Sequence, residues 1–147
     1  MKIPSKVEGL RITVMRITRQ QDYAVILMAH LAKDYGVRMV PLSEVAKIYR
    51  LSPLFLRQIA SVLKKHGLLI SREGVKGGYK LIRDPADISV ADVIEAFEGS
   101  TALTICGAHG AGLVCDKEAF CHPQITWAKI NQEIRQVLHK KTLAQFL

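Results

Sequence analysis

The spacing of apolar residues along the chain predicts five helices. In each, apolar side chains recur three and four positions apart, which places them on one face of an α-helix. Capping residues indicate where helices begin: Thr18 with Gln21 forms a capping box, and Ser52 is followed by Pro53 at a first helical position. The expected helices cover residues 18–33, 42–49, 53–66, 90–97 and a stretch that begins at 123, with a short final helix over 142–147.

Two short β-rich runs interrupt the helical pattern. Residues 68–72 and 79–82 read as strands, and the turn between them contains Gly74, Gly77 and Gly78. The resulting hairpin directly follows two short helices joined by a tight turn, which is the helix-turn-helix arrangement. The predicted fold is therefore mainly α with a small β-hairpin wing: a winged helix-turn-helix followed by a long C-terminal helix.

The same pattern suggests four parts. Residues 1–14 are expected to form a flexible N-terminal extension, 15–104 the winged helix-turn-helix, 105–121 a cysteine-bearing loop, and 122–147 a dimerisation helix and tail. The long helix carries an apolar stripe that a second copy of the chain is expected to cover, giving a homodimer with two-fold symmetry. The stripe residues are Trp127, Ile130, Ile134 and Val137.

Positive charge is concentrated in one segment. The formal net charge is +8, and residues 45–83 hold nine basic residues against one acidic residue, so this segment alone carries +8. A localised basic face is the electrostatic footprint of nucleic acid, whereas the plainer alternatives are a solvated charged surface and a winged helix that binds only protein. If the partner is double-stranded DNA, the second helix enters the major groove and the wing approaches the backbone or the minor groove. The expected contacts include Ser52, Pro53, Leu54 and Gln58 on the helix, and Arg72, Lys76 and Gly77 on the wing.

All three cysteines, Cys106, Cys115 and Cys121, lie in the glycine-bearing loop 105–121. No apolar run approaches the length of a membrane span, and the first residues lack the apolar centre of a signal peptide, which predicts a cytoplasmic protein with reduced thiols. Three thiolates on a flexible loop favour an iron–sulfur cluster, and zinc, thiol redox chemistry or a disulfide with one free thiol are the alternatives. The sequence shows no nucleophile–base set and no phosphate loop, so an enzyme is not expected.

Several stretches together resemble the Rrf family of bacterial winged-helix transcription regulators, whose iron–sulfur members include IscR, NsrR and RirA. The resemblance lies in MRIT at 15–18 followed by Asp22-Tyr23-Ala24, in PLSEVAKIYRLSPLFLRQIASVLKKHGLL, GVKGGYKL and ISVADVIEAFEG, and in the three cysteines. It implies a dimeric regulator that binds DNA and holds a two-iron or four-iron cluster through these cysteines. The implied signal is nitric oxide, redox state or the supply of iron, and the alternative is a metal-free thiol switch on the same fold.

The chain departs from the family at two positions. IscR-like members supply the fourth ligand from a histidine three residues after the last cysteine, where this chain has Gln124. NsrR-like members use an acid in the first helix of the other subunit, and Asp22 occupies that position. Asp22 is therefore the preferred candidate for the fourth ligand, and His109 and His122 are the alternatives. On the recognition helix the IscR-like glutamate is replaced by Arg57, which can bind guanine with two hydrogen bonds, so a different operator is expected.

Overall fold

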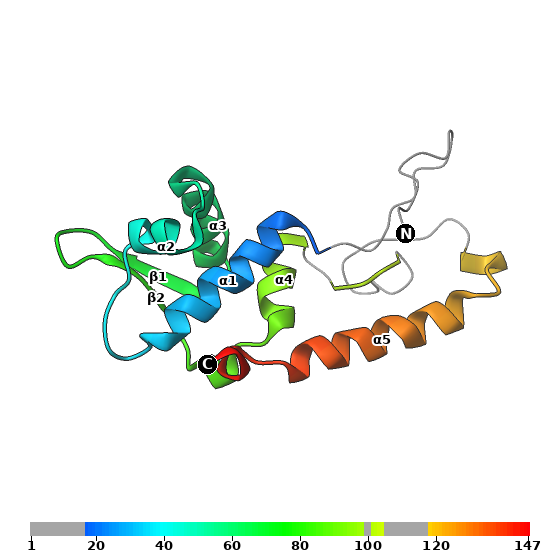
Figure 1. The fold of residues 1–147 in the computed structure, drawn as a ribbon. Coiled ribbons are helices and arrows are strands. Elements are labelled where there is room, and N and C mark those ends of the chain that lie inside the picture. The colour runs from blue at the N-terminus through cyan, green and yellow to red at the C-terminus, as the bar shows by residue number, and fades with distance from the viewer. Residues whose placement is uncertain (1–16, 99–100, 105–117) are drawn as a thin grey trace, which may run out of the picture.

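Residues 17–98, 101–104 and 118–147 are described in the computed structural model of the chain. The helices and strands follow the expected order, and helix and strand ends lie within a residue or two of the expected ones. The helices are α1 (Arg19–Lys33), α2 (Leu42–Tyr49), α3 (Pro53–Lys65), α4 (Val90–Glu98) and α5 (Gln124–Lys140), the strands are β1 (Leu69–Arg72) and β2 (Gly78–Leu81), and the 3-10 turns are η1 (Pro85–Asp87), η3 (Glu118–Phe120) and η4 (Leu143–Phe146). The winged helix-turn-helix with a long C-terminal helix is confirmed (Figure 1).

Side-chain caps fix where α1, α3 and α4 begin. The Thr18 hydroxyl accepts from Gln21 N at 3.3 Å, and the Gln21 side chain accepts from Thr18 N at 2.8 Å. Ser52 Oγ accepts from Phe55 N at 3.4 Å, and Ser89 Oγ accepts from Asp92 N at 3.1 Å. Each cap satisfies backbone donors that have no partner within the helix, so short helices start at defined residues.

The core joins α1, α3, α4 and the hairpin into one body. Helices α1 and α3 contribute half of its largest fully buried side chains, and the others come from both strands, the turn before α4, Val40, Val45 and Leu143. The apolar faces that the sequence pattern predicted are the faces that meet. The largest side chains in this core are Leu27, Met28, Leu31, Leu56, Ile59, Leu63, Leu69, Leu81 and Ile88.

The wing is fastened to the helices through its second strand. In the antiparallel hairpin Leu69 faces Leu81 and Arg72 faces Gly78. Val40, in the connection between α1 and α2, then pairs with Tyr79 through two backbone hydrogen bonds of 2.9 Å each. Gly78 allows this approach: its φ is +149°, and a Cβ there would lie 2.5 Å from the Val40 carbonyl oxygen.

Helix α5 projects from this body: its N-terminal end lies far from the body, and its C-terminal end lies beside it (Figure 1). The tail then tucks back against the start of α4: Leu143 N donates to Ile88 O at 2.9 Å, Val90 N donates to Lys141 O at 2.7 Å, and the Leu143 side chain is fully buried. Among the residues of α5 only Asn131 is buried. No helix in the described part of the chain is long and apolar enough to cross a bilayer.

The Val40–Tyr79 attachment gives a direct test. Gly78→Ala places a Cβ against the Val40 carbonyl and also strains a backbone with positive φ, whereas Gly36→Ala pays only the strain, because no atom lies within 4 Å of a Cβ at Gly36. We expect Gly36→Ala to lower the free energy of unfolding by about 1–2 kcal/mol and Gly78→Ala to lower it by clearly more. Urea denaturation measures both, and equal losses would contradict the close approach.

Candidate nucleic-acid interface and cysteine centre

Helix α3 turns one face to solvent at its N-terminal end. Leu54, Arg57 and Gln58 are exposed, and their spacing of three and four residues puts them on the same side of the helix. We call these three residues the reading face. Ser52 and Pro53, also expected as contacts, are exposed as well, but the Ser52 hydroxyl serves as the helix cap.

The turn between α2 and α3 contains a conformation that the sequence did not reveal. Arg50 has φ +53° and ψ +43°, in the left-handed region, and Leu51 N donates to Ala46 O at 3.0 Å. Arg50 is the one residue other than glycine with positive φ in the described part of the chain. Glycine or asparagine usually marks a left-handed residue at a helix end, so the arginine at position 50 did not predict this conformation.

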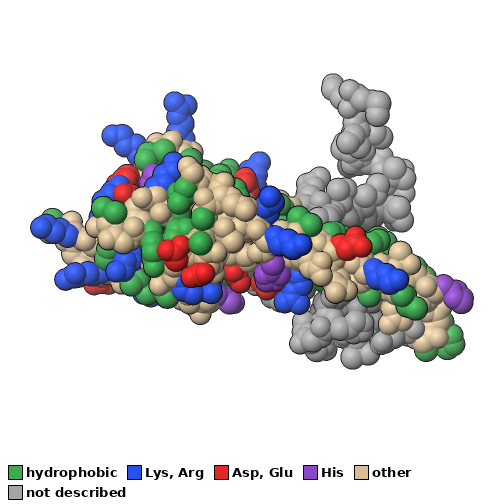
Figure 2. Space-filling model, turned by 90° about the horizontal axis from the view of Figure 1, so that it is seen from below, with side chains coloured by type: hydrophobic (Ala, Val, Ile, Leu, Met, Phe, Trp, Pro, Cys, Tyr) green, Lys and Arg blue, Asp and Glu red, His purple; other side chains and the backbone are tan. Residues whose placement is uncertain are grey.

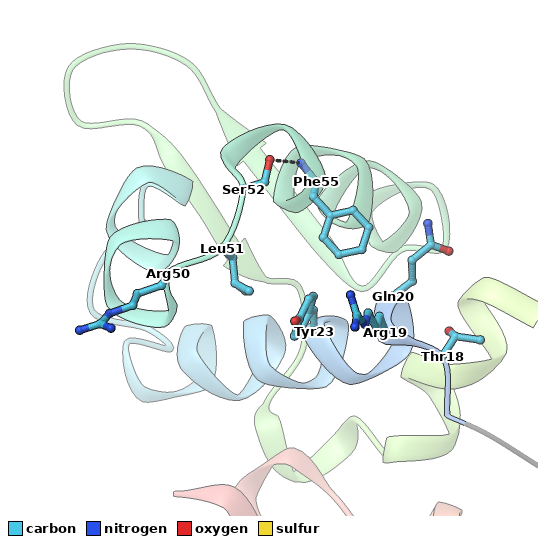
Figure 3. Close-up of a pocket in the computed structure, with 8 residues that line it drawn as sticks. All are labelled: Thr18, Arg19, Gln20, Tyr23, Arg50, Leu51, Ser52 and Phe55. Atoms are coloured by element: carbon cyan, nitrogen blue, oxygen red, sulfur yellow. Dashed lines mark hydrogen bonds between the residues drawn. The ribbon is translucent and has the colours of Figure 1, made fainter. Parts of the chain in front are cut away.

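An open depression lies between the starts of α1 and α3 (Figure 3). Tyr23 and Phe55 meet there edge to face, with ring centroids 5.7 Å apart. In Figure 3 the Phe55 ring points toward α1, and the Arg50 side chain points away from the depression. The N-terminal part of α1 therefore packs directly on the N-terminal end of α3, the expected recognition helix. The remaining residues that line the depression are Thr18, Arg19, Gln20, Leu51 and Ser52.

The basic segment is exposed and unpaired. All nine basic residues between 45 and 83 are exposed, and none of them forms an ion pair with a described residue. Figure 2 shows Lys and Arg side chains projecting from the end of the molecule that carries the wing. An accumulation of unneutralised cations on one side of a fold attracts a polyanion. The nine are Lys47, Arg50, Arg57, Lys64, Lys65, Arg72, Lys76, Lys80 and Arg83.

At the wing tip Arg72 and Lys76 extend into solvent, and Val75 is fully exposed. Gly77 plays a different part from the one expected of a contact residue. A Cβ at Gly77 would collide with the backbone of Arg72 and Glu73, and Gly77 N donates to Gly74 O at 2.9 Å. Gly77 therefore forms the tight turn that presents the tip.

A charged network joins the end of α1 to the start of α2. Arg38 donates to both Glu44 oxygens at 2.7 and 2.9 Å and contacts Asp34 at 2.8 Å. Hydrogen bonds from Arg38 lower the pKa of Glu44 to about 2, and Glu44 in turn raises the pKa of Arg38. His30 Nε2 lies 3.6 Å from Glu44, and the His30 ring packs edge-on against Tyr49.

His30, Asp34 and Glu44 have donor atoms within 4.8 Å of one another, the only group in the described residues with this metal-like arrangement. Arg38 already neutralises both carboxylates, so the guanidinium holds the position that a cation would take. His30 is 8% exposed and is therefore a packed histidine of the α1 face. This network was not found from the sequence, because its members are separated by loop residues.

The cysteine centre is described only in part. Cys121 is a partly exposed free thiol just before α5, while Cys106, Cys115 and His109 lie outside the described residues. Asp22 is exposed in the first turn of α1, and its carboxylate contacts no other described side chain. The start of α1 and the segment that precedes α5 lie far apart within one chain (Figure 1). His122 is exposed beside Cys121.

The segment that enters the cysteine loop is anchored on α5. Asn131 Oδ1 accepts from Leu103 N at 2.6 Å, and Asn131 Nδ2 donates to Thr104 Oγ1 at 2.9 Å. Thr101 Oγ1 also donates to Glu95 on α4 at 3.3 Å. A buried amide that is satisfied in this way fixes the backbone two residues before Cys106. Asn131 was not among the expected site residues, since a single asparagine in a helix gives no signal.

These features define a winged-helix protein of the DNA-binding class, with a reading face, a basic wing and a long appended helix. The family Rrf2, described as an iron-dependent transcriptional regulator, matches residues 17–147. The chain belongs to this family, as its resemblance predicted, and is a transcription regulator rather than an enzyme.

Named relatives and solved structures agree with this assignment. The chain is 35% identical over 134 residues to the HTH-type transcriptional regulator IscR of Sodalis glossinidius, covering 90% of this chain and 79% of that protein. IscR of T. potens has a TM-score of 0.69 and 34% identity, covering 88% of this chain and 84% of that one. CymR, the global cysteine regulator of B. subtilis, has a TM-score of 0.73 and 28% identity, covering 89% and 95%.

The Arg38–Glu44 pair predicts an acid dependence of stability. The pKa of Glu44 falls from an ordinary value of 4.5 to about 2, so the pair stabilises the fold fully above pH 4.5 and loses this effect as the pH falls toward 2. We expect Arg38→Met to lower the thermal midpoint at pH 7 and to change it less at pH 3. Arg83→Met removes an exposed arginine without an ion pair among the described residues, and it should show no such difference. A constant gap between wild type and Arg38→Met from pH 7 to pH 3 would contradict the pairing.

Proposed function

We propose that the chain is a dimeric transcription regulator whose binding to a DNA operator is controlled by an iron–sulfur cluster. The cluster is held by Cys106, Cys115 and Cys121 of one subunit and by Asp22 of the other. The observation that supports the DNA part most strongly is the set of nine exposed basic residues between positions 45 and 83, none of which forms an ion pair with a described residue. Phosphate contacts by these residues position the protein, and the reading face then distinguishes bases.

The donor set suits an iron–sulfur cluster. Thiolates are its usual ligands, and Cys121 is a free, partly exposed thiol. Asp22 adds an exposed carboxylate with no competing partner among the described residues. When bound, the cluster supplies a redox-active and chemically reactive centre. A carboxylate holds iron less firmly than a thiolate, so a site with one oxygen ligand favours a labile cluster that suits a sensor.

Two copies are needed to assemble this site. In Figure 1 the start of α1, which carries Asp22, and the segment before α5, which carries Cys121, are well separated within one chain, so a site that uses both residues would form between subunits. The exposed apolar face of α5 supports the same assembly. Trp127 is 39% and Val137 58% exposed, and Ile130 and Ile134 are only partly covered. Burial of this stripe against a second α5 removes apolar surface from water.

The contact between Tyr23 and Phe55 supplies a route from the cluster to DNA. Asp22 and Tyr23 are neighbours in α1; Asp22 faces solvent, while Tyr23 packs on Phe55 at the start of α3. If Asp22 holds a cluster, Asp22 would be free after the cluster is lost, and the first turn of α1 could then shift against α3 at the contact of Tyr23 with Phe55. Regulation follows only if the two positions of α1 differ in their free energy of DNA binding.

A metal-free thiol switch on the same fold is the second candidate. Cys121 is a free thiol at an accessible position. One structural relative, CymR of Staphylococcus aureus, is known in an oxidized form, with a TM-score of 0.67 and 31% identity. Anaerobic purification with an absorption spectrum and iron and sulfide analysis separates the two candidates, because a colourless, iron-free protein with redox-controlled DNA binding would exclude the cluster.

The ligand role of Asp22 has a direct test. Asp22→Ala removes the oxygen ligand, and we expect faster decay of the visible absorption of the anaerobically purified protein on exposure to air, with an altered spectrum. Asp87→Ala removes another exposed acid and serves as the matched control. Both variants should unfold at the same temperature as the wild type after removal of iron. An unchanged spectrum and decay rate for Asp22→Ala would remove Asp22 from the site.

The basic segment predicts a strong dependence of DNA affinity on salt. The logarithm of the binding constant should fall linearly with the logarithm of salt concentration, by about 0.9 for each phosphate contact. Lys76→Ala at the wing tip should reduce this slope by about 1 per subunit and weaken binding to all sequences alike. Lys129→Ala on α5 removes an exposed lysine outside the basic segment and should leave the slope unchanged. A slope near zero for the wild type would argue against DNA as the partner.

A further inference from the structure

Leu54 is an unusual member of the reading face. It is the second residue of α3, and 63% of its surface is exposed. The neighbouring Phe55 turns inward and packs on Tyr23 at 5.7 Å, so the core uses Phe55 and leaves Leu54 in solvent. The core that α3 shares with α1 and the hairpin is built from Leu56, Ile59 and Leu63. Leu54 therefore lies outside the hydrophobic core.

A single exposed leucine is common on protein surfaces and usually needs no explanation. Leu54 differs because of the residues beside it. Arg57 and Gln58 lie three and four positions on, on the same face, and their side chains can form paired hydrogen bonds with guanine and adenine. An apolar residue one helical turn before two base-reading side chains, at the start of the helix that is proposed to enter the groove, is placed to meet the floor of the major groove.

The major groove offers one apolar group to such a side chain, the C5 methyl of thymine. We propose that Leu54 packs on a thymine methyl group and makes the protein require a T·A pair at one position of each half-site. This inference rests on the proposed operator binding and names what one part of the reading face recognises. It assigns a specificity role to Leu54 that is separate from the roles of Arg57 and Gln58.

Helix geometry limits where this thymine lies. Residues three or four apart on a helix have Cβ atoms about 5–6 Å apart, and successive base pairs are about 3.4 Å apart. The thymine should therefore lie within about two base pairs of the guanine or adenine that Arg57 or Gln58 contacts. An operator whose required thymine lies farther than this from the contacted guanine or adenine would not fit this arrangement.

The test replaces single thymines by deoxyuridine, which pairs identically but lacks the methyl group. The full-length protein first selects duplexes from a randomised pool, and each conserved thymine of the selected site is then changed in turn. At one position of each half-site we expect deoxyuridine to weaken binding by about fourfold, the factor for losing one buried methyl group. Leu54→Ala should bind the thymine duplex about equally weakly and should be insensitive to deoxyuridine at that position.

Val75→Ala is the matched control, because it removes an exposed apolar side chain at the wing tip, away from the reading face. It should remain sensitive to deoxyuridine at the same position. Thermal unfolding of Leu54→Ala should match that of the wild type, since Leu54 lies outside the core. Equal deoxyuridine effects in wild type and Leu54→Ala, or no sensitive thymine at all, would overturn the inference while leaving DNA binding intact. If no duplex is enriched, the proposed DNA binding falls as well.

Discussion

The paired hydrogen bonds between Val40 and Tyr79 determine how the whole DNA-facing surface is assembled. A two-stranded hairpin alone is only marginally stable in water. Here the connection between α1 and α2 pairs with Tyr79 as a one-residue third strand, and Gly78 allows the backbones to come this close. Val40 is 1% exposed, so the attachment is part of the core. The wing therefore has a fixed position relative to α3, and the basic tip and reading face form one surface.

Helix α5, unlike the wing, is only weakly attached to the core. It extends from the body with only Asn131 buried. The contacts that hold it include the Asn131 hydrogen bonds to Leu103 and Thr104, the 3.5 Å contact of Arg135 with Glu95, the contacts of His139 with Ser89 and Glu95, and the buried Leu143 of the tail. A helix in water gains little stability from its own hydrogen bonds and depends on packing of its apolar face. Within the described residues that face has little cover, which makes a second copy the natural source of stability. The same helix holds Leu103 and Thr104 through Asn131, so the proposed dimer would be coupled to the position of these two residues.

Local chemistry made much of this fold predictable. Thr18 and Ser52 act as the caps that the sequence indicated. Ser89 caps α4 in the same way, and Gly67 follows the end of α3 with φ +69°. The unpredicted features depend on residues far apart in sequence or on backbone contact. The pairing of Val40 with Tyr79 uses only main-chain atoms, Asn131 acts on residues 27 and 28 positions away, and Arg50 adopts a conformation that its side chain does not favour. For the candidate site, the order of the elements along the sequence predicted α3 as the DNA-reading helix, but only the fold separates exposed Leu54 from Phe55, which packs on α1.

Helix α1 is the element through which the proposed cluster and the reading face would communicate. Its first turn carries Asp22 on one side and Tyr23 on the other, and Tyr23 meets Phe55 one residue after Leu54. The body of α1 is held by Leu27, Met28 and Leu31 in the core, so a force on Asp22 cannot move the whole helix freely. Displacement is thus confined to the first turn and to the contact with α3. Packed aromatic contacts favour discrete arrangements over gradual deformation, and two such arrangements are what a switch between DNA-bound and released states requires.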